Sequence, residues 1–292
     1  AIGGVMAFQT LSPSYSVNGE ITTSGQVAAR MATANNEQTI HAHVKIGWEK
    51  WAMVTSLSSF DYGHLRQGRH GPEDYIKSYF VQRQDGVDRI IDQDDELMQI
   101  PTAYHQNNLM QKVRFRASNA LDLEYGFHYS ETTDYGRYDR HNRVRNGLPR
   151  HAEWRYGPQK WMMNLLKTVH KPVDMALYDE LQFRAAWQRF QESRIDRSFN
   201  RPTRSIREEE VDAYSINLDF KKATSETHTL FYGFEYVSND VTSKGTEQDI
   251  VADNRQVGAS RYPQSTWQSI AFYLTDEYEL SEALTAQIGL RY

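Results

Sequence analysis

The chain has 292 residues, no cysteine, and 33 basic against 38 acidic side chains, which gives a net charge of −5. The lack of cysteine excludes disulfide scaffolds, iron–sulfur sites and thiol nucleophiles, and the acidic balance argues against nucleic acid, a partner that usually requires a basic surface. The chain is 24% charged and yet 12% aromatic, which suits aromatic side chains on one face of strands better than a single central core.

About eleven segments are predicted to form strands. Apolar and polar residues alternate strictly at residues 40–48, 121–130, 211–220, 230–237 and 284–291, and more weakly at residues 24–31, 51–60, 109–116, 161–170, 181–190 and 268–278. A period of two predicts a strand because successive strand side chains point to opposite faces, whereas a helix would scatter both classes around its surface. No run of about 18 apolar residues occurs, so a membrane-spanning helix is not expected.

The predicted connections between these strands are alternately short and long. Short ones centre on residues 49–50, 118–119, 171–179, 222–227 and 281–282, and long ones cover about residues 61–108, 131–160, 191–210 and 238–265. The first connection, near residues 35–36, is short as well. Long loops collected at one end and short turns at the other are typical of an outer-membrane β-barrel.

The two faces of the predicted strands differ in chemistry. One face is expected to lie in lipid, where five alternate residues, spread over about nine positions, span about 23 Å at a rise of about 3.3 Å per position and a tilt of about 40°. Its members include Ala42, Val44, Ile46, Leu123, Phe127, Ile216, Leu218, Phe234 and Ile288. The opposite face carries Lys112, Arg114, Arg116, Asp122, Glu124, Arg184 and Gln188. A dry core cannot hold so many charges, so we predict a wet or plugged lumen.

The first residues resemble a known family. Ala1-Ile2-Gly3-Gly4-Val5-Met6-Ala7-Phe8 is similar to the last strand of the plug domain in TonB-dependent outer-membrane receptors. Residues 137–140, 153–159, 192–197 and 260–263 resemble the same family, and most of all its haemin/haemoglobin-type branch. The resemblance implies the end of a plug at residues 1–12 and the first half of the barrel at residues 13–292. Both ends interrupt this pattern, so we expect an internal piece of a longer receptor.

The fold class expected from pattern and resemblance together is all-β. It is an antiparallel transmembrane β-barrel, present here as an open part-barrel of about eleven strands preceded by the end of a plug domain. About eleven strands are roughly half of the 22 in plugged outer-membrane transporters. The strands near residues 24–31 and 284–292 should therefore be free edges of an open sheet.

The resemblance implies a transporter of the bacterial outer membrane rather than an enzyme. Its partners would be outer-membrane lipid, TonB through a segment that precedes this piece, and a ligand held by outer loops and plug. The ligand would be an iron source: haem or a haem protein ahead of a siderophore. No cofactor is expected to be bound by this piece itself, because the histidine ligands of haem in the family lie outside it; haem or an iron chelate would be cargo.

Arginine and aromatic residues in the long predicted loops are the candidate ligand-binding residues. They are Arg137, Tyr138, Arg140, Arg143, Trp154, Tyr156 and Tyr262. Arginine binds carboxylates in a bidentate manner, so the cluster can meet haem propionates or an acidic patch of a carrier protein. The alternative for the arginines is ion pairing with Asp134 and Asp139. The alternative for Trp154, Tyr156 and Trp161 is an aromatic girdle at the upper membrane boundary.

Two further motifs have a metal-binding alternative. His41 and His43 lie on one strand face, so both rings can reach one metal ion, but no third ligand is fixed nearby in sequence. The acidic run Asp92, Asp94, Asp95 and Glu96 offers oxygen ligands but lacks the spacing of a calcium loop. The interpretations we favour are lumen-facing polar residues and a solvated outer loop.

Two other functions compete with energised transport. A passive porin-like channel would need no plug, and the glycine-rich start of the chain argues against it. A soluble all-β carbohydrate-binding module would stack sugars on exposed tryptophan and tyrosine, and the charged inner face argues against it.

Overall fold

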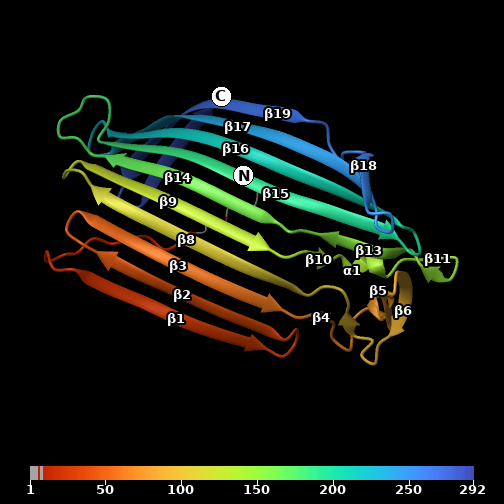
Figure 1. Cartoon of the computed structure of the whole chain (residues 1–292). Coiled ribbons are helices and arrows are strands. Elements are labelled where there is room, and N and C mark those ends of the chain that lie inside the picture. The colour runs from red at the N-terminus through yellow and green to blue at the C-terminus, as the bar shows by residue number, and fades with distance from the viewer. Residues whose placement is uncertain (1–5, 7–8) are drawn as a thin grey trace.

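The computed structural model describes Met6 and residues 9–292, and one large antiparallel sheet dominates it (Figure 1). Within these residues, eleven strands follow one another along the sheet. They are β1 (Thr22–Ala32), β2 (Glu37–Gly47), β3 (Trp51–Tyr62), β8 (Tyr104–Arg116), β9 (Leu121–Thr132), β14 (Lys160–His170), β15 (Glu180–Ser198), β16 (Thr203–Ala223), β17 (His228–Asp249), β19 (Ser265–Ser281) and β20 (Leu284–Arg291). The predicted all-β class and strand number are confirmed.

The sheet is open, as predicted. β1 and β20 are its two outer strands, and neither has a second partner strand in the described part of the chain. Each inner strand pairs with its neighbours in sequence order along this path, because a short turn or a returning loop brings consecutive strands together.

Smaller elements lie between the long strands at the loop end of the sheet (Figure 1). They are β4 (Leu65–Arg66), η1 (Glu73–Tyr75), β5 (Tyr79–Gln84), β6 (Val87–Asp92), β7 (Met98–Gln99), β10 (Tyr135–Gly136), α1 (Tyr138–His141), β11 (Val144–Arg145), β12 (Leu148–Pro149), β13 (His151–Tyr156) and β18 (Asn254–Gly258). In the described residues, no helix is long and apolar enough to cross a membrane.

The predicted long connection at residues 191–210 is wrong. β15 and β16 continue their ladder to a four-residue turn at residues 199–202, where Asn200 has a positive φ of 57°. β17 likewise extends to Asp249, deep into the predicted loop at residues 238–265. A backbone ladder does not need apolar side chains, and opposite charges across strands support it; Arg207 Nη1, for example, lies 2.8 Å from Asp196 Oδ1.

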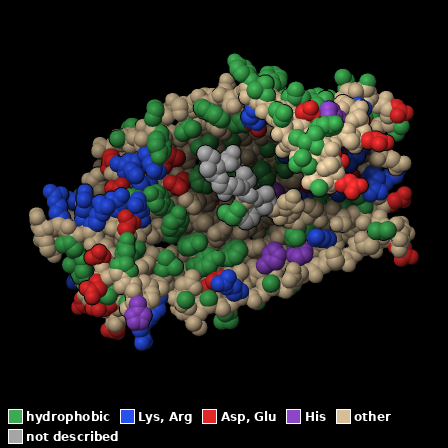
Figure 2. Space-filling view, turned by 180° about the vertical axis from the view of Figure 1, so that it is seen from behind, with side chains coloured by type: hydrophobic (Ala, Val, Ile, Leu, Met, Phe, Trp, Pro, Cys, Tyr) green, Lys and Arg blue, Asp and Glu red, His purple; other side chains and the backbone are tan. Residues whose placement is uncertain are grey.

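The register defines two faces of the sheet. Arg114 stands opposite Glu124, and Phe115 stands opposite Leu123, so charged and apolar side chains alternate between faces as predicted. The residues that precede β1 cross the charged face: Lys112 Nζ donates to Thr10 Oγ1 at 2.7 Å, and the Tyr15 hydroxyl donates to Asp122 at 2.8 Å. This face is the hollowed side of the molecule (Figure 2).

All nine residues predicted to face lipid lie on the opposite, convex face. Cross-strand pairing without a register shift links Ile46 and Val44 in β2 to Leu218 in β16 and Phe234 in β17 on this face. Several of these side chains are exposed, and Ile288 is 77% exposed. An apolar surface of this extent needs an apolar environment.

The apolar face has a sharp upper limit on β15 and β16. Trp187 and Tyr214 are cross-strand partners at this level, and the Trp187 indole N–H donates to Asp212 at 2.9 Å. Beyond them the same face carries Arg189, Asp212, Gln191 and Glu210. Aromatic residues between apolar and charged bands are the pattern of a membrane interface.

Candidate functional site

Segments from three connections pack together beyond the upper limit of the apolar face. The 61–103 connection contributes β5, β6 and η1, the 133–159 connection contributes α1 and β13, and the third part is the upper end of β15 and β16 (Figure 1). We call this the loop assembly. It lies at the end of the sheet opposite the short turns.

Hydrogen bonds between distant segments hold η1 against α1. The Tyr138 hydroxyl donates to the Tyr75 carbonyl at 2.8 Å, and the Asn142 amide donates to the Asp74 carbonyl at 3.2 Å. Lys77 Nζ donates to the His141 carbonyl at 2.6 Å. These partners are more than 60 positions apart in sequence, so the first connection is fixed on the second.

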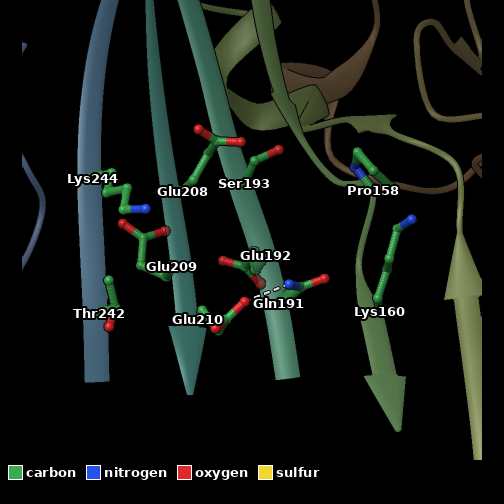
Figure 3. Close-up of a pocket in the computed structure, with 10 residues that line it drawn as sticks. All are labelled: Pro158, Lys160, Gln191, Glu192, Ser193, Glu208, Glu209, Glu210, Thr242 and Lys244. Carbon is green, nitrogen blue, oxygen red and sulfur yellow. Dashed lines mark hydrogen bonds between the residues drawn. The ribbon is translucent and has the colours of Figure 1, made fainter. Parts of the chain in front are cut away.

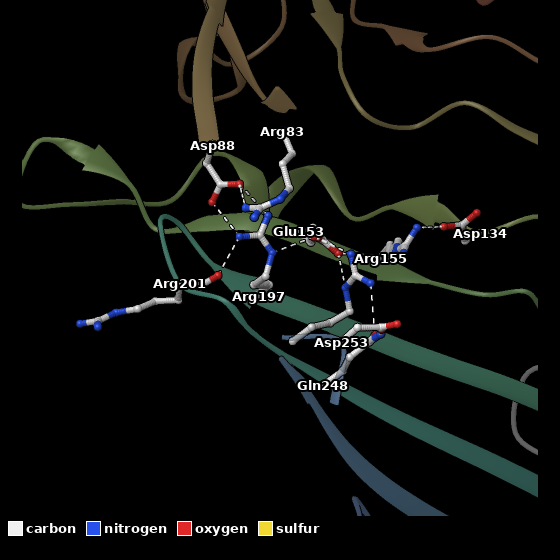
Figure 4. A network of polar contacts seen from close by, with 10 residues as sticks. Arg83, Asp88, Asp134, Glu153, Arg155, Arg197, Arg201, Gln248 and Asp253 are labelled. Carbon is white, nitrogen blue, oxygen red and sulfur yellow. Dashed lines mark hydrogen bonds and ion pairs between the residues drawn. The ribbon is translucent and has the colours of Figure 1, made fainter. Parts of the chain in front are cut away.

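A buried ion-pair network ties β6 to β13 and to the β15–β16 turn (Figure 4). Arg197 donates to both carboxylate oxygens of Asp88 at 2.7 Å, and the backbone N–H of Asn200 donates to Asp88 at 2.8 Å. Arg197 also donates to Glu153, which accepts two further hydrogen bonds from Arg204 at 2.8 Å. The side chains of Asp88 and Arg197 are 0% and 1% exposed. Such a pair survives burial only because its geometry and extra hydrogen bonds offset desolvation.

The pKa values of titratable groups in the loop assembly show that its interior is shielded from solvent. Burial lowers the pKa of Lys77 to about 8 and the pKa of His141 to about 4. Burial alone would raise the pKa of Asp88 and of Glu153, but hydrogen bonds from the arginines outweigh it and hold both pKa values below their usual range. At neutral pH, therefore, His141 is neutral and both carboxylates are ionised.

The structure brings six of the seven candidate ligand-binding residues together. Trp154 lies at the centre with three arginine side chains near its ring, those of Arg137, Arg140 and Arg194, at 5.1 to 5.7 Å. Arg137 Nη1 also lies 3.4 Å from the Tyr156 hydroxyl, and Arg143 follows α1 at the surface. Tyr262 belongs to a different segment, after β18.

Burial divides these candidates into two groups. Tyr138 and Trp154 are only 7% and 6% exposed, and their contacts pack the assembly. Arg143 and Tyr262 are exposed. Arg137 and Arg140 pair with Asp139, at 2.6 and 3.6 Å, so the alternative of local ion pairing is realised for these two arginines. Contact with a ligand stays a prediction for the whole set.

The girdle alternative is wrong for two of the aromatic residues. Trp154 is buried inside the loop assembly, and Trp161 lies on the charged face, where its indole N–H donates to Gln188 at 3.2 Å. A girdle requires aromatic rings at the edge of the lipid-facing surface. Trp187 and Tyr214 hold that position.

A cavity of about 290 Å³ opens beside Trp154. Its lining includes Tyr135, His141, Arg155 and Arg204. The cavity offers an aromatic wall, but its two guanidinium groups are already paired with carboxylates of the same lining, Arg155 with Asp134 and Arg204 with Glu153. Sequence reasoning missed Arg155 and Arg204 as members of one site.

A second, acidic pocket of about 300 Å³ lies on β15, β16 and β17 (Figure 3). Glu208 and Glu210 line it from convex-face positions, together with Gln191, Lys160 and Lys244. The Gln191 amide donates to Glu210 at 2.5 Å. The pocket lies above the apolar band, beyond Trp187 and Tyr214.

The predicted acidic loop carries no metal cluster. Asp95 pairs with Arg66 and accepts a hydrogen bond from the Leu97 amide, as a solvated outer loop would. In residue 6 and residues 9–292, no three His, Asp or Glu side chains are grouped so as to hold a metal ion. His41 and His43 form a pair, described below.

Comparison with known proteins gives relatives by structure alone: no protein-family model and no curated protein matches the sequence. The copper transporter OprC superposes with a TM-score of 0.67 over 95% of this chain, at 9% identity. The ferric yersiniabactin uptake receptor FyuA from Yersinia pestis covers 96% at a TM-score of 0.55 and 11% identity. The ferric citrate transporter FecA covers 93% at 0.54 and 13% identity. The chain has the fold of a TonB-dependent receptor barrel.

The chain spans only part of each of these structures: 37% of OprC, 43% of FyuA and 37% of FecA.

Proposed function

We propose that this chain is part of the wall of a TonB-dependent transporter in the bacterial outer membrane. The observation that carries the proposal is that β15 and β16 pass from an apolar convex band into a packed loop assembly above it. The fold shared with transporters over 95% of the chain supports it. Outer-membrane lipid would contact the convex face, and TonB would act through a segment beyond the described residues.

The cargo we propose is an iron source, with haem or a haem protein ahead of a siderophore. The sequence resemblance to the haemin/haemoglobin-type branch supports this choice. The arginines around Trp154 support it as well, because arginine pairs well with carboxylates such as haem propionates. The residues that would first meet the cargo are Arg137, Arg140, Arg143 and Tyr262, with plug residues completing the site.

Uptake by the complete protein in a Gram-negative host tests the proposal. Growth on haemin as the sole iron source should require both the protein and TonB, and an uncoupler that collapses the proton gradient should stop it. Uptake that continues without TonB would favour the passive channel instead. A protein that shows no heat-modifiable mobility on gels and stays out of the membrane fraction would favour the soluble module.

A further inference from the structure

Two histidines are paired on the charged face of β2, outside the loop assembly. His41 Nε2 lies 3.2 Å from His43 Nδ1, and the ring centroids are 5.5 Å apart. Their cross-strand partners are Ser58 and Ser56 of β3. Both rings are half-buried, so they are held by neighbours yet open to the lumen.

The spacing of the two nitrogens matches that of two ligands on one metal ion. Zinc–imidazole bonds are about 2.0–2.1 Å long, and a tetrahedral angle then places two such nitrogens about 3.3 Å apart. The 3.2 Å between His41 and His43 is therefore also the distance that a shared ion requires. Small rotations of the two rings convert a hydrogen bond between them into two bonds to a metal.

A neighbouring hydroxyl orients the first ligand. His41 Nδ1 lies 2.8 Å from Ser58 Oγ. When this nitrogen donates to the serine, the proton is on Nδ1 and the lone pair of Nε2 faces His43. Metal-binding histidines usually have such a partner on their second nitrogen, because it fixes tautomer and ring orientation.

The other groups on this face define what kind of ion fits. Gln26 of β1 is directly opposite His43, within reach as an oxygen ligand or through water. No carboxylate is paired with either histidine in the described registers, which disfavours calcium and magnesium, since those ions prefer oxygen ligands. Lys45 is the next residue on the face, and its charge reduces the affinity for any cation.

We propose that His41 and His43 form a bidentate site for a first-row divalent transition-metal ion on the lumen wall. Ser58 is a positioning residue that acts through His41. Two imidazoles and water favour Cu²⁺ over the other ions of this row. The site is separate from the cavity beside Trp154, and it does not rest on the proposed transport function, because equilibrium binding measures it.

Titration of the complete detergent-solubilised protein with Cu²⁺, followed by electron paramagnetic resonance, tests the proposal. Wild-type protein should bind one ion with the spectral splitting of two nitrogen ligands. His41→Ala and His43→Ala should each weaken binding at least tenfold and leave a single-nitrogen spectrum. Ser58→Ala should weaken binding while keeping two nitrogens. His105→Ala, which removes a histidine from the convex face of β8, where its Nε2 lies 3.5 Å from Ser59 Oγ, is the control and should change nothing.

A measurement on wild-type protein keeps the test independent of variant folding. Cu²⁺ should protect His41 and His43, and not His105, from carbethoxylation, as read by mass spectrometry. Equal affinity in wild type and both alanine variants, or equal labelling with and without Cu²⁺, would overturn the proposal.

Discussion

The membrane wall and the loop assembly share strands β15 and β16 but are stabilised by different forces. On the convex face below Trp187 and Tyr214, apolar side chains are exposed and need an apolar environment. Above that level the strands continue with charged side chains, and ion pairs such as Asp88–Arg197 are fully buried. The apolar face of the wall is therefore stabilised by surroundings outside the chain, whereas the loop assembly is stabilised by contacts within the chain. Each change described below is expected to affect one of these two regions and to leave the other unchanged.

The largest expected effect is in the loop assembly. Arg197→Met leaves the Asp88 carboxylate buried without its main partner, and removing one member of a buried pair costs about 3–5 kcal/mol. Hydrogen exchange in the complete protein should show β5 and β6 opening faster, with β16 below Tyr214 unchanged. Arg207→Met is the control: its pair with Asp196 is partly exposed and should cost no more than about 1 kcal/mol. Equal exchange in both variants would contradict the role of the network.

Placing a charge in the wall should have the next largest effect. Leu218→Arg puts a guanidinium on the convex face and should cost about 2–4 kcal/mol if the residue lies near the midplane of the membrane. Asn217→Arg is the matched control on the charged face and should be tolerated. Urea unfolding of the complete protein in lipid vesicles gives the two free energies, and a reversed order would invert the assignment of faces.

Acid should loosen the loop assembly before the wall. Burial lowers the pKa of His141 to about 4 from the ordinary value of 6.5. As the pH falls below about 6.5, His141 therefore becomes protonated in the unfolded state while it stays neutral in the folded state. Stability of the assembly should fall by about 1–2 kcal/mol between pH 7 and pH 5. His141→Gln removes the titration. If hydrogen exchange near α1 has the same pH dependence in both proteins, another group is responsible.

The smallest effect is expected from the surface arginines. Neutralising Arg137, Arg140 and Arg143 together should weaken binding of haemin to the complete protein more at low salt than at high salt, because exposed charges are screened. Lys160→Gln and Lys244→Gln, on the other pocket, provide the control. Affinity that is unchanged at both salt concentrations would assign the arginines to structure alone.

The wall was predicted well from the sequence because its two faces require side chains of different polarity. A sheet between lipid and a polar lumen imposes strict alternation, so the faces of β2, β9, β16 and β17 were readable from their sequences. The sequence predicts loops at the upper ends of β15, β16 and β17, because both faces are polar there and the alternation disappears while the ladder continues.

The loop assembly was predicted only in part for a different reason. Asp88 and Arg197 are 109 positions apart, and nothing in the residues around either one signals the other. Trp154 and Arg137 were identified as candidates, but burial of Trp154 follows from packing between three connections. The positions of Arg155 and Arg204 in the same cavity required the fold.

Site-directed spin labelling of β16 in lipid vesicles tests the central claim most directly. Labels at positions 216 and 218 should be quenched by oxygen, which partitions into lipid, and labels at 215 and 217 by a polar nickel chelate. Labels at 208 and 210 share the convex face but lie above Tyr214, and they should report water. Lipid at 208 and 210, or water at 216 and 218, would contradict the division of one sheet into a membrane wall and a loop assembly.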